Sequence, residues 1–232
     1  MINRNQAIAL HEQLAKMGTA LSCPQRLRLL NLLCQSERSV ETIAQAMSLS
    51  VATVSHHLQH LRNVRLVTSR KVGRFVTYAL AGPEVVAFWL QYRDFCSSRL
   101  AEFQVMRDDL VAQRKARGVV DRRELQQLLK NGEITLLDLR PQLEFDAGHL
   151  PGAISCPIQQ LAERLAGFPQ GKTLVLYCRG PLCLLADIAQ EQLAAKGIKS
   201  LQFTDGVTEW ASAGLPIKRS SSYRSLFTSE GP

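Results

Sequence analysis

Cys178 and Cys183 are the residues of this sequence whose type and spacing point most directly to chemistry. They bracket four residues, Arg179-Gly-Pro-Leu182, between the apolar run 173–177 and a helix-like stretch. Two thiols this close can resolve one another's oxidised or persulfidated state by disulfide exchange. Alternatively, Cys183 only packs in the first turn of the following helix. A zinc site ranks last, because no C-x2-C pair or nearby histidine completes a tetrahedron. We expect no metal and no cofactor.

The elements around this pair alternate between strands and helices. We predict strands at 134–140, 173–177 and 200–203, a turn-rich segment at 141–154, and four helices, at 122–131, 158–165, 181–196 and 208–214. This alternation predicts an α/β domain with a parallel sheet flanked by helices. Cys178 would then end a strand at the carboxyl edge of the sheet, where open α/β folds bind ligands. Loop amides and a helix N-terminus favour an anion there, so we expect a lowered pKa for the Cys178 thiol.

Residues 119–218 resemble a rhodanese domain. The motifs that carry the resemblance are Asp138-Leu-Arg140-Pro with Glu144-Phe145, Gly148-His149-Leu-Pro-Gly-Ala153, the Cys178 loop, Asp205-Gly206, Trp210 and Gly214-Leu-Pro216. The resemblance implies that Cys178 forms a persulfide, which accepts sulfur from a sulfane-sulfur donor and passes it to a thiol acceptor. We assign the catalytic loop to Cys178, Arg179, Gly180 and Cys183, and we interpret Arg140, Glu144 and His149 as structural.

The loop departs from the patterns of related enzymes. Active sulfurtransferases often show C-x-x-G-x-R or C-x-x-G-x-T, whereas here Gly180 stands one place early and the sixth position is Cys183. Arg179 is then the only cation in the loop, which disfavours thiosulfate recognition. The phosphatase pattern C-x5-R has Leu184 at its arginine position, so we expect neither phosphatase activity nor arsenate reduction by that route.

Positive charge is concentrated in the first half of the chain. The net charge is +8; residues 1–118 hold 16 Lys and Arg against 8 Asp and Glu, while residues 119–232 hold 12 of each. No acidic residue lies between Glu41 and Glu84. Such an asymmetry is typical of a nucleic-acid-binding module, although a solvated basic face is the alternative. Apolar runs are far shorter than the roughly 20 residues of a membrane span, and the N-terminus lacks a signal-peptide core. We therefore expect a cytoplasmic protein that does not bind membranes.

Two short helices and a turn are predicted within this basic half. Ile43, Ala44 and Met47 share one face of the first helix, and Val54, Leu58 and Leu61 share one face of the second. The turn Ser48-Leu-Ser50 between them is typical of a helix-turn-helix. A hairpin with a basic tip at Gly73 follows. The side chains that we expect to contact DNA are Thr53, Ser55, His56, Gln59, His60 and Arg62 on the second helix and Arg70, Lys71 and Arg74 on the hairpin.

This half of the chain, about residues 5–110, resembles the winged helix-turn-helix of ArsR-type regulators. The matching residues are Pro24-Gln-Arg26, Ser55-His-His-Leu-Gln-His-Leu-Arg62, Leu66-Val67, and Gly73-Arg74 with Tyr78. The resemblance implies a mainly α winged-helix fold and a dimeric repressor that leaves its double-stranded operator when an inducer binds. The soft-metal site of the family needs a C-x-C pair, which residues 39–43 lack, so classical metal sensing is disfavoured.

Apolar residues recur every three or four positions from Val85 to Leu110, which predicts one long helix over 84–117. We expect this helix to form the seam of a homodimer, with packing on the second domain as the alternative. Cys34 and Cys96 resemble the paired thiols of sulfide-responsive relatives; buried packing is the alternative role.

The sequence thus predicts a DNA-binding and dimerisation domain at 1–112, a basic junction at 113–118, a rhodanese-like domain at 119–219 and a flexible tail at 220–232. The favoured function is a DNA-binding repressor that senses or carries reactive sulfur through a cysteine persulfide. An active sulfurtransferase tethered to a DNA-binding domain and a metalloid-responsive repressor are the alternatives.

Overall fold

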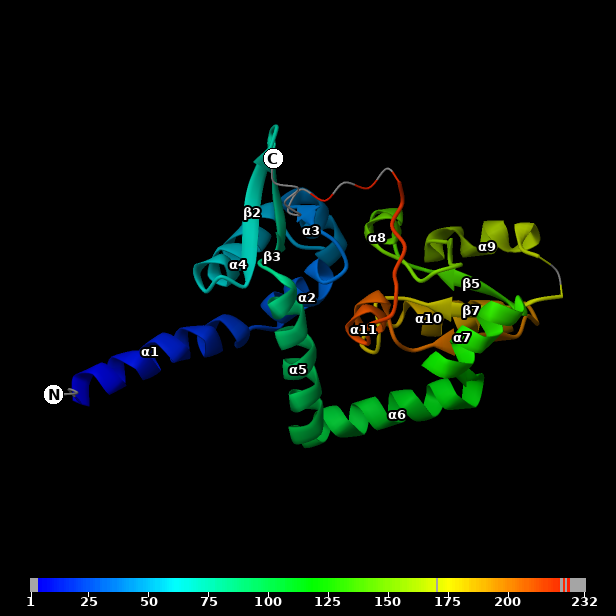
Figure 1. The fold of residues 1–232 in the computed structure, drawn as a ribbon, viewed down its shortest axis with the longest axis horizontal. Helices are drawn as coiled ribbons and strands as arrows, with labels where there is room; N and C mark the ends of the chain where they lie inside the picture. Colours follow the sequence, from blue (N-terminus) through cyan, green and yellow to red (C-terminus); the bar gives the residue numbers. More distant parts are fainter. Residues whose placement is uncertain (1–3, 170, 222, 224, 226–232) are drawn as a thin grey trace. The chain divides into compact units, whose positions relative to one another are not determined.

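The computed structural model describes residues 4–169, 171–221, 223 and 225 of the 232-residue chain. The chain divides into two compact units, residues 1–89 and residues 90–224 (Figure 1). The limits expected from the sequence, 1–112 and 119–219 with a junction at 113–118, stay predictions. Most of the tail predicted at 220–232 lies outside the described residues. No helix in the described part of the chain is long and apolar enough to cross a membrane.

The first unit is a winged helix-turn-helix. Its helices are α1 (Arg4–Leu21), α2 (Pro24–Leu33), α3 (Val40–Met47) and α4 (Val51–Asn63). Its antiparallel sheet has the order β1 (Arg38–Ser39), β3 (Phe75–Leu80), β2 (Val67–Val72), and β2 and β3 form the hairpin of the wing (Figure 1). The six apolar residues predicted to face inward from the two short helices are all buried. The pattern did not predict α1 or the two-residue strand β1.

Short polar side chains set the turn between α3 and α4. Ser48 ends α3 in the left-handed region at φ 55°, and the side chain of Ser50 accepts the backbone N–H of Thr53 at 3.1 Å, which caps α4. Serine at an N-cap satisfies an amide that the first helical turn leaves open. The turn therefore fixes where α4 begins, and with it which side chains lie near its N-terminus.

The single helix predicted over 84–117 was wrong. The structure has α5 (Pro83–Arg99) and α6 (Ala101–Arg117), separated by Leu100 in an extended conformation at φ −92° and ψ 111°. The Ser98 hydroxyl donates to the Phe95 carbonyl, and the Gln104 side-chain amide donates to the Ser98 carbonyl, both at 2.8 Å. These side chains satisfy the backbone groups that a break leaves open, so polar side chains outweigh the apolar periodicity.

The second unit contains the predicted parallel sheet. Its strand order is β4 (Val119–Val120), β8 (Ser200–Phe203), β7 (Thr173–Tyr177), β5 (Ile134–Asp138), β6 (Ile154–Ser155), and every pair is parallel. The helices of this domain are α7 (Arg122–Asn131), α8 (Gln142–Ala147), α9 (Leu161–Arg164), α10 (Leu185–Ala194) and α11 (Val207–Ser212), with 3-10 turns at Ile158–Gln160 and Leu165–Gly167. The predicted α/β fold with a parallel sheet flanked by helices is confirmed.

Alternating side chains of the central strands fill two cores. Leu174, Leu176 and Cys178 join the cluster that includes Ala186, Ala189 and Leu193 of α10. Val175 and Tyr177 join the opposite cluster, with Leu125 of α7 and Trp210 of α11. This period of two places the Cys178 side chain on the same face of the sheet as α10.

Two local predictions in this domain need correction. The segment 141–154, expected to be turn-rich, contains α8 and the start of β6. The helix expected at 181–196 begins only at Leu185. Its expected first turn is a loop because the Cys183 amide bonds to the Gly180 carbonyl at 3.0 Å, and Arg114 takes the carbonyls of Pro181 and Cys183. A carbonyl used by a side chain in this way stabilises a loop in place of a helical turn.

Candidate functional site: a two-cysteine loop beside α6

Cys178 and Cys183 face one another across the loop that joins β7 to α10. The Cys178 residue is buried, and Cys183 is half-buried. The Cys178 thiol donates to the backbone carbonyl of Cys183 at a sulfur–oxygen distance of 3.6 Å. Cys183 therefore belongs to the loop itself and not to the first turn of α10.

The pKa values of the two thiols are shifted in opposite directions. A side-chain hydrogen bond from the Cys178 thiol to the Cys183 sulfur lowers the pKa of the Cys183 thiol to about 6, and the backbone amides of Leu185 and Arg179 add to the effect. The same hydrogen bond, together with burial, raises the pKa of Cys178 well above its usual value. The expected lowering of the Cys178 pKa was therefore wrong, because the hydrogen bond with Cys183 and burial outweigh the backbone amides that favour the Cys178 thiolate. At neutral pH the thiolate is therefore that of Cys183, the more accessible of the two cysteines.

Two glycines let the loop lie close to the start of α11. Gly180 has φ +108°, and a Cβ there would come 2.7 Å from the Glu209 carboxylate. A Cβ on Gly206 would come 2.6 Å from the Arg179 carbonyl carbon. Glu209 itself accepts the Gly206 amide at 2.9 Å. The loop thus depends on glycine at both positions for its closeness to Glu209.

Arg179 is not available as a free cation. Its guanidinium binds both oxygens of the buried Glu144 carboxylate, at 2.6 to 3.0 Å. Glu144, interpreted from the sequence as structural, therefore also neutralises the positive charge of Arg179 in the reactive loop. Arg140 does have a structural role, because its buried guanidinium binds Asp138 and the Gly148 carbonyl. His149 stacks on Phe145 with ring centroids 3.7 Å apart.

Arg114 on α6 holds the other side of the loop. Its guanidinium donates to the carbonyls of Pro181 and Cys183, each at 3.0 Å, and pairs with Asp187 of α10 at 2.8 Å. Arg114 is almost completely buried. The sequence did not reveal this residue, since it lies in a run of basic residues that we interpreted as a junction. An arginine in register with the apolar positions Phe103, Met106 and Leu110 was the available signal.

A second arginine connects α5 to the same loop. Arg93 forms an ion pair with Glu209, the carboxylate that lies against Gly180. Both partners of this pair are about one-tenth exposed. The reactive loop is therefore in contact with α6 directly, through Arg114, and with α5 through Glu209.

The side chains predicted to contact DNA lie on α4 and on the β2–β3 wing of the first unit. All nine are exposed except Ser55, which is half-buried. His56 and His60 approach each other at 3.2 Å on α4, and Arg62 donates to Ser69 on β2 at 3.3 Å. Arg74 at the wing lies over the Phe75 ring, 4.9 Å from its centroid. Their roles in binding stay predictions.

Cys34 and Cys96 belong to different compact units. Cys34 caps the end of α2, and Cys96 lies on α5, where it hydrogen bonds to Tyr92. Burial, with this hydrogen bond, raises the pKa of the Tyr92 hydroxyl. The sensor role of the two thiols stays a prediction.

Comparison with known proteins agrees with both units. Residues 23–69 match the model of bacterial regulatory proteins of the arsR family, and residues 121–213 match that of rhodanese-like domains. The HTH-type transcriptional regulator Rv0324 of Mycobacterium tuberculosis is 38% identical over 209 residues, which cover 90% of this chain and 92% of that protein. The chain belongs to the arsR family of bacterial regulatory proteins. This ArsR-family regulator carries a rhodanese-like domain after its helix-turn-helix.

Two further relatives of the ArsR-family regulator each match one part of it. A sulfurtransferase of Allochromatium vinosum is 29% identical over 99 residues, which cover 42% of this chain and 92% of that protein. The solution structure of a homodimeric winged helix-turn-helix domain from Mycobacterium bovis covers 44% of this chain and 94% of its own, with 33% identity and a TM-score of 0.41.

Proposed function

We propose that this regulator is a homodimeric repressor that leaves its operator DNA when reactive sulfur loads onto the Cys178–Cys183 pair. The observation that carries the proposal is the bond between Arg114 of α6 and the Cys183 carbonyl, since it joins the reactive loop to the helix that follows α5. Chemistry at the loop then has a physical route to the segment that continues into the DNA-binding unit.

The DNA contacts follow from the exposed polar face of α4. Thr53, Ser55 and Gln59 read base edges in the major groove, and His56, His60 and Arg62 lie along the same helix. Arg70, Lys71 and Arg74 of the wing contact phosphates, which carry no sequence information themselves. The acid-free segment 42–83 avoids repulsion between the protein and the phosphate backbone.

Exposed apolar side chains support a dimer. Ile8, Leu10 and Leu14 on α1 are each more than half exposed. Apolar side chains exposed along one helix in this way are typical of an interface between subunits. A two-fold dimer also matches the symmetry of operators read by helix-turn-helix proteins.

The sulfur chemistry starts at Cys183. Its thiolate attacks the outer sulfur of a persulfide donor R–S–SH, the donor's S–S bond breaks, and R–S⁻ leaves as Cys183–S–SH forms. The Cys178 thiol then loses its proton and attacks the inner sulfur, which releases HS⁻ and leaves a Cys178–Cys183 disulfide. The first step conserves oxidation state overall, and in the second the Cys178 sulfur is oxidised while the outer sulfur is reduced to sulfide. Closing the disulfide removes the Cys178 S–H donor from the Cys183 carbonyl.

This loss changes what holds the loop. The Cys183 carbonyl accepts from both the Cys178 thiol and Arg114 in the reduced protein. After the disulfide closes, Arg114 is its remaining donor, so the loop and α6 shift toward a second arrangement with lower DNA affinity. A ligand or modification acts in this way only by favouring one of two states.

The test is DNA binding by the reduced protein, before and after treatment with a sulfane-sulfur donor, with intact mass measured on the same sample. The duplex is one selected by the protein from a random pool. We expect the wild type to gain the mass of one sulfur atom first, and to release DNA when the disulfide closes, which leaves the protein two hydrogen atoms lighter than in its reduced state. A Cys178→Ser, Cys183→Ser double variant should do neither. Wild-type protein that loads sulfur and keeps its DNA would contradict the sensor function.

Similarity to a sulfurtransferase favours a second candidate, an enzyme tethered to DNA. Such an enzyme turns over many sulfur atoms per chain in the presence of a thiol acceptor, whereas the sensor stops after about one. The number of sulfide molecules released per chain separates the two.

A further inference from the structure

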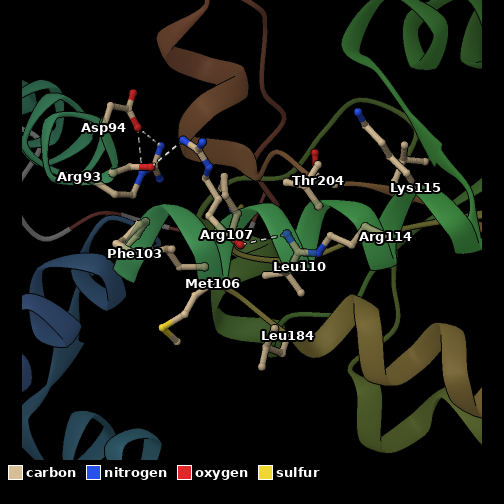
Figure 2. A pocket seen from close by; sticks show the side chains of 15 residues that line it. Arg93, Asp94, Phe103, Met106, Arg107, Leu110, Arg114, Lys115, Leu184 and Thr204 are labelled. Carbon is tan, nitrogen blue, oxygen red and sulfur yellow. Dashed lines mark hydrogen bonds and ion pairs between the residues drawn. The ribbon is translucent and has the colours of Figure 1, made fainter. Parts of the chain in front are cut away.

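A cavity of about 530 Å³ lies along α6, beside the two-cysteine loop and within the second compact unit. Its apolar wall is formed by Phe103, Met106, Leu110 and Val111 on α6 and by Leu182 and Leu184 on the loop. In Figure 2, Phe103, Met106, Leu110 and Arg114 follow one another along the helix, with Leu184 nearby. This volume suits a small organic molecule.

We propose that this cavity binds the sulfur donor of the proposed function, and that the donor is an organic persulfide with an apolar body and at most one negative charge. The inference rests on the proposed function and adds to it the chemical class of the donor.

The cavity borders the reactive loop through residues on either side of Cys183. Leu182 and Leu184 stand on either side of Cys183 in the chain; their exposed fractions are 47% and 52%, and both line the cavity. Arg114, which holds the Cys183 carbonyl, lines it too. A molecule in the cavity therefore lies against the residues that position the Cys183 thiol. Exposed leucines on a catalytic loop otherwise cost free energy, and an apolar occupant would cover them.

The charges around the cavity are nearly all paired. Arg93 binds Glu209 and Asp94, Arg107 binds Asp108, and Arg114 binds Asp187. Lys115 is the one lining cation for which the described residues give no ion pair. One ammonium group matches a persulfide anion R–S–S⁻ or its R–S⁻ product, each with a single charge.

Thiosulfate is poorly matched to the same surroundings. It carries two negative charges, and the cation of the loop, Arg179, is already bound to both oxygens of Glu144. Moving a dianion from water against an apolar wall without paired donors is costly. The site therefore discriminates by charge against thiosulfate and by apolar contact in favour of an organic donor.

The reaction in the cavity is the first step already given for Cys183. The Cys183 thiolate attacks the outer sulfur of R–S–SH, a new S–S bond forms as the donor's S–S bond breaks, and R–S⁻ departs. The apolar R group stays against α6 while its outer sulfur reaches the loop. Binding the R group raises the effective concentration of that sulfur at the thiolate.

The test measures the rate of sulfur loading by intact mass, with benzyl persulfide, thiosulfate and inorganic polysulfide as donors. We expect benzyl persulfide to load at least about a hundredfold faster than thiosulfate. Val111→Glu places a carboxylate in the cavity and should slow benzyl persulfide by about tenfold or more, while polysulfide, which needs no apolar contact, should be slowed much less. Val105→Glu is the matched control, since Val105 is exposed on the same helix and does not line the cavity.

The outcomes separate this inference from the proposed function. If polysulfide loads the pair and releases DNA, but benzyl persulfide has no advantage or Val111→Glu and Val105→Glu behave alike, the donor assignment is wrong and the sensor function stands. If no donor loads sulfur onto the pair, both are wrong.

Discussion

The guanidinium of Arg114 donates to the backbone carbonyl of Cys183 at 3.0 Å, and the Cys178 thiol donates to the same oxygen at 3.6 Å. One carbonyl thus has a donor from the reactive pair and a donor from α6. The first is lost when the Cys178–Cys183 disulfide closes, and the second is positioned to respond to that loss.

Arg114→Lys tests this link. Lysine keeps the positive charge beside Asp187, which limits the penalty of leaving a buried carboxylate unpaired, but it cannot bridge Asp187 and both loop carbonyls. We expect sulfur loading and DNA binding by the reduced protein to persist. The change in DNA affinity on loading should fall from the roughly 5- to 150-fold typical of coupled sites to less than about twofold.

Arg117→Lys is the matched control for that variant. Arg117 also pairs with Asp187, and with Glu191, but it makes no bond to the loop carbonyls among the described contacts. The account requires this variant to release DNA like the wild type. Equal loss of release in both variants would point to the docking of α6 on α10 in general and not to the Cys183 carbonyl.

The pH dependence of thiol reactivity tests which of the two cysteines loses its proton first. Because the pKa of Cys183 is lowered to about 6, its thiolate is present above about pH 6 and is lost below it. Alkylation of one thiol in the loop should therefore show its midpoint near pH 6. Cys178→Ala removes the hydrogen-bond donor and should move the midpoint upward. Peptide mapping that finds Cys178 modified first would contradict the assignment.

Gly206→Ala should displace the reactive loop. The added Cβ would meet the Arg179 carbonyl carbon at 2.6 Å and the Gly180 nitrogen at 2.7 Å, and backbone atoms cannot move aside as a flexible side chain can. Overpacking of this kind costs about 1–3 kcal/mol. We expect a lower midpoint in urea unfolding and slower alkylation of Cys183. Gly167→Ala, with nothing within 4 Å, should change neither.

Substitutions on the DNA-binding face should separate two kinds of contact. Arg74→Ala should weaken binding on every sequence and reduce the slope of log affinity against log salt by about one, because one phosphate contact is lost. Gln59→Ala should change sequence preference with little change in that slope. Binding to a set of point-mutated duplexes at several salt concentrations measures both. If the two variants lose affinity equally on every duplex, α4 is not the recognition helix.

Local patterns predicted the fold well where burial decides the structure. The apolar residues around Ile43 and Leu58 and those of the central strands recur with clear periods. These periods predicted the helix-turn-helix and the parallel sheet. The break at Leu100 was missed because it depends on side-chain bonds from Ser98 and Gln104, which leave no apolar signature. Helix periodicity alone cannot show such competition for backbone groups.

Only part of the site could be predicted, for a related reason. The cysteine pair is local in sequence and was identified directly. The pairing of Glu144 with Arg179 joins residues 35 positions apart, and that of Arg114 with Cys183 joins residues 69 apart. Contacts over such separations arise from the packing of whole elements, so residue types near either partner do not reveal them.

The most direct measurement is native mass spectrometry of the regulator with a duplex that it binds, after treatment with less than one equivalent of persulfide per chain. Free protein and protein–DNA complexes are then weighed in the same sample. The account predicts that the Cys178–Cys183 disulfide is found in the free protein and is depleted from the DNA-bound protein. Equal modification of the two populations would show that the loop does not control DNA binding.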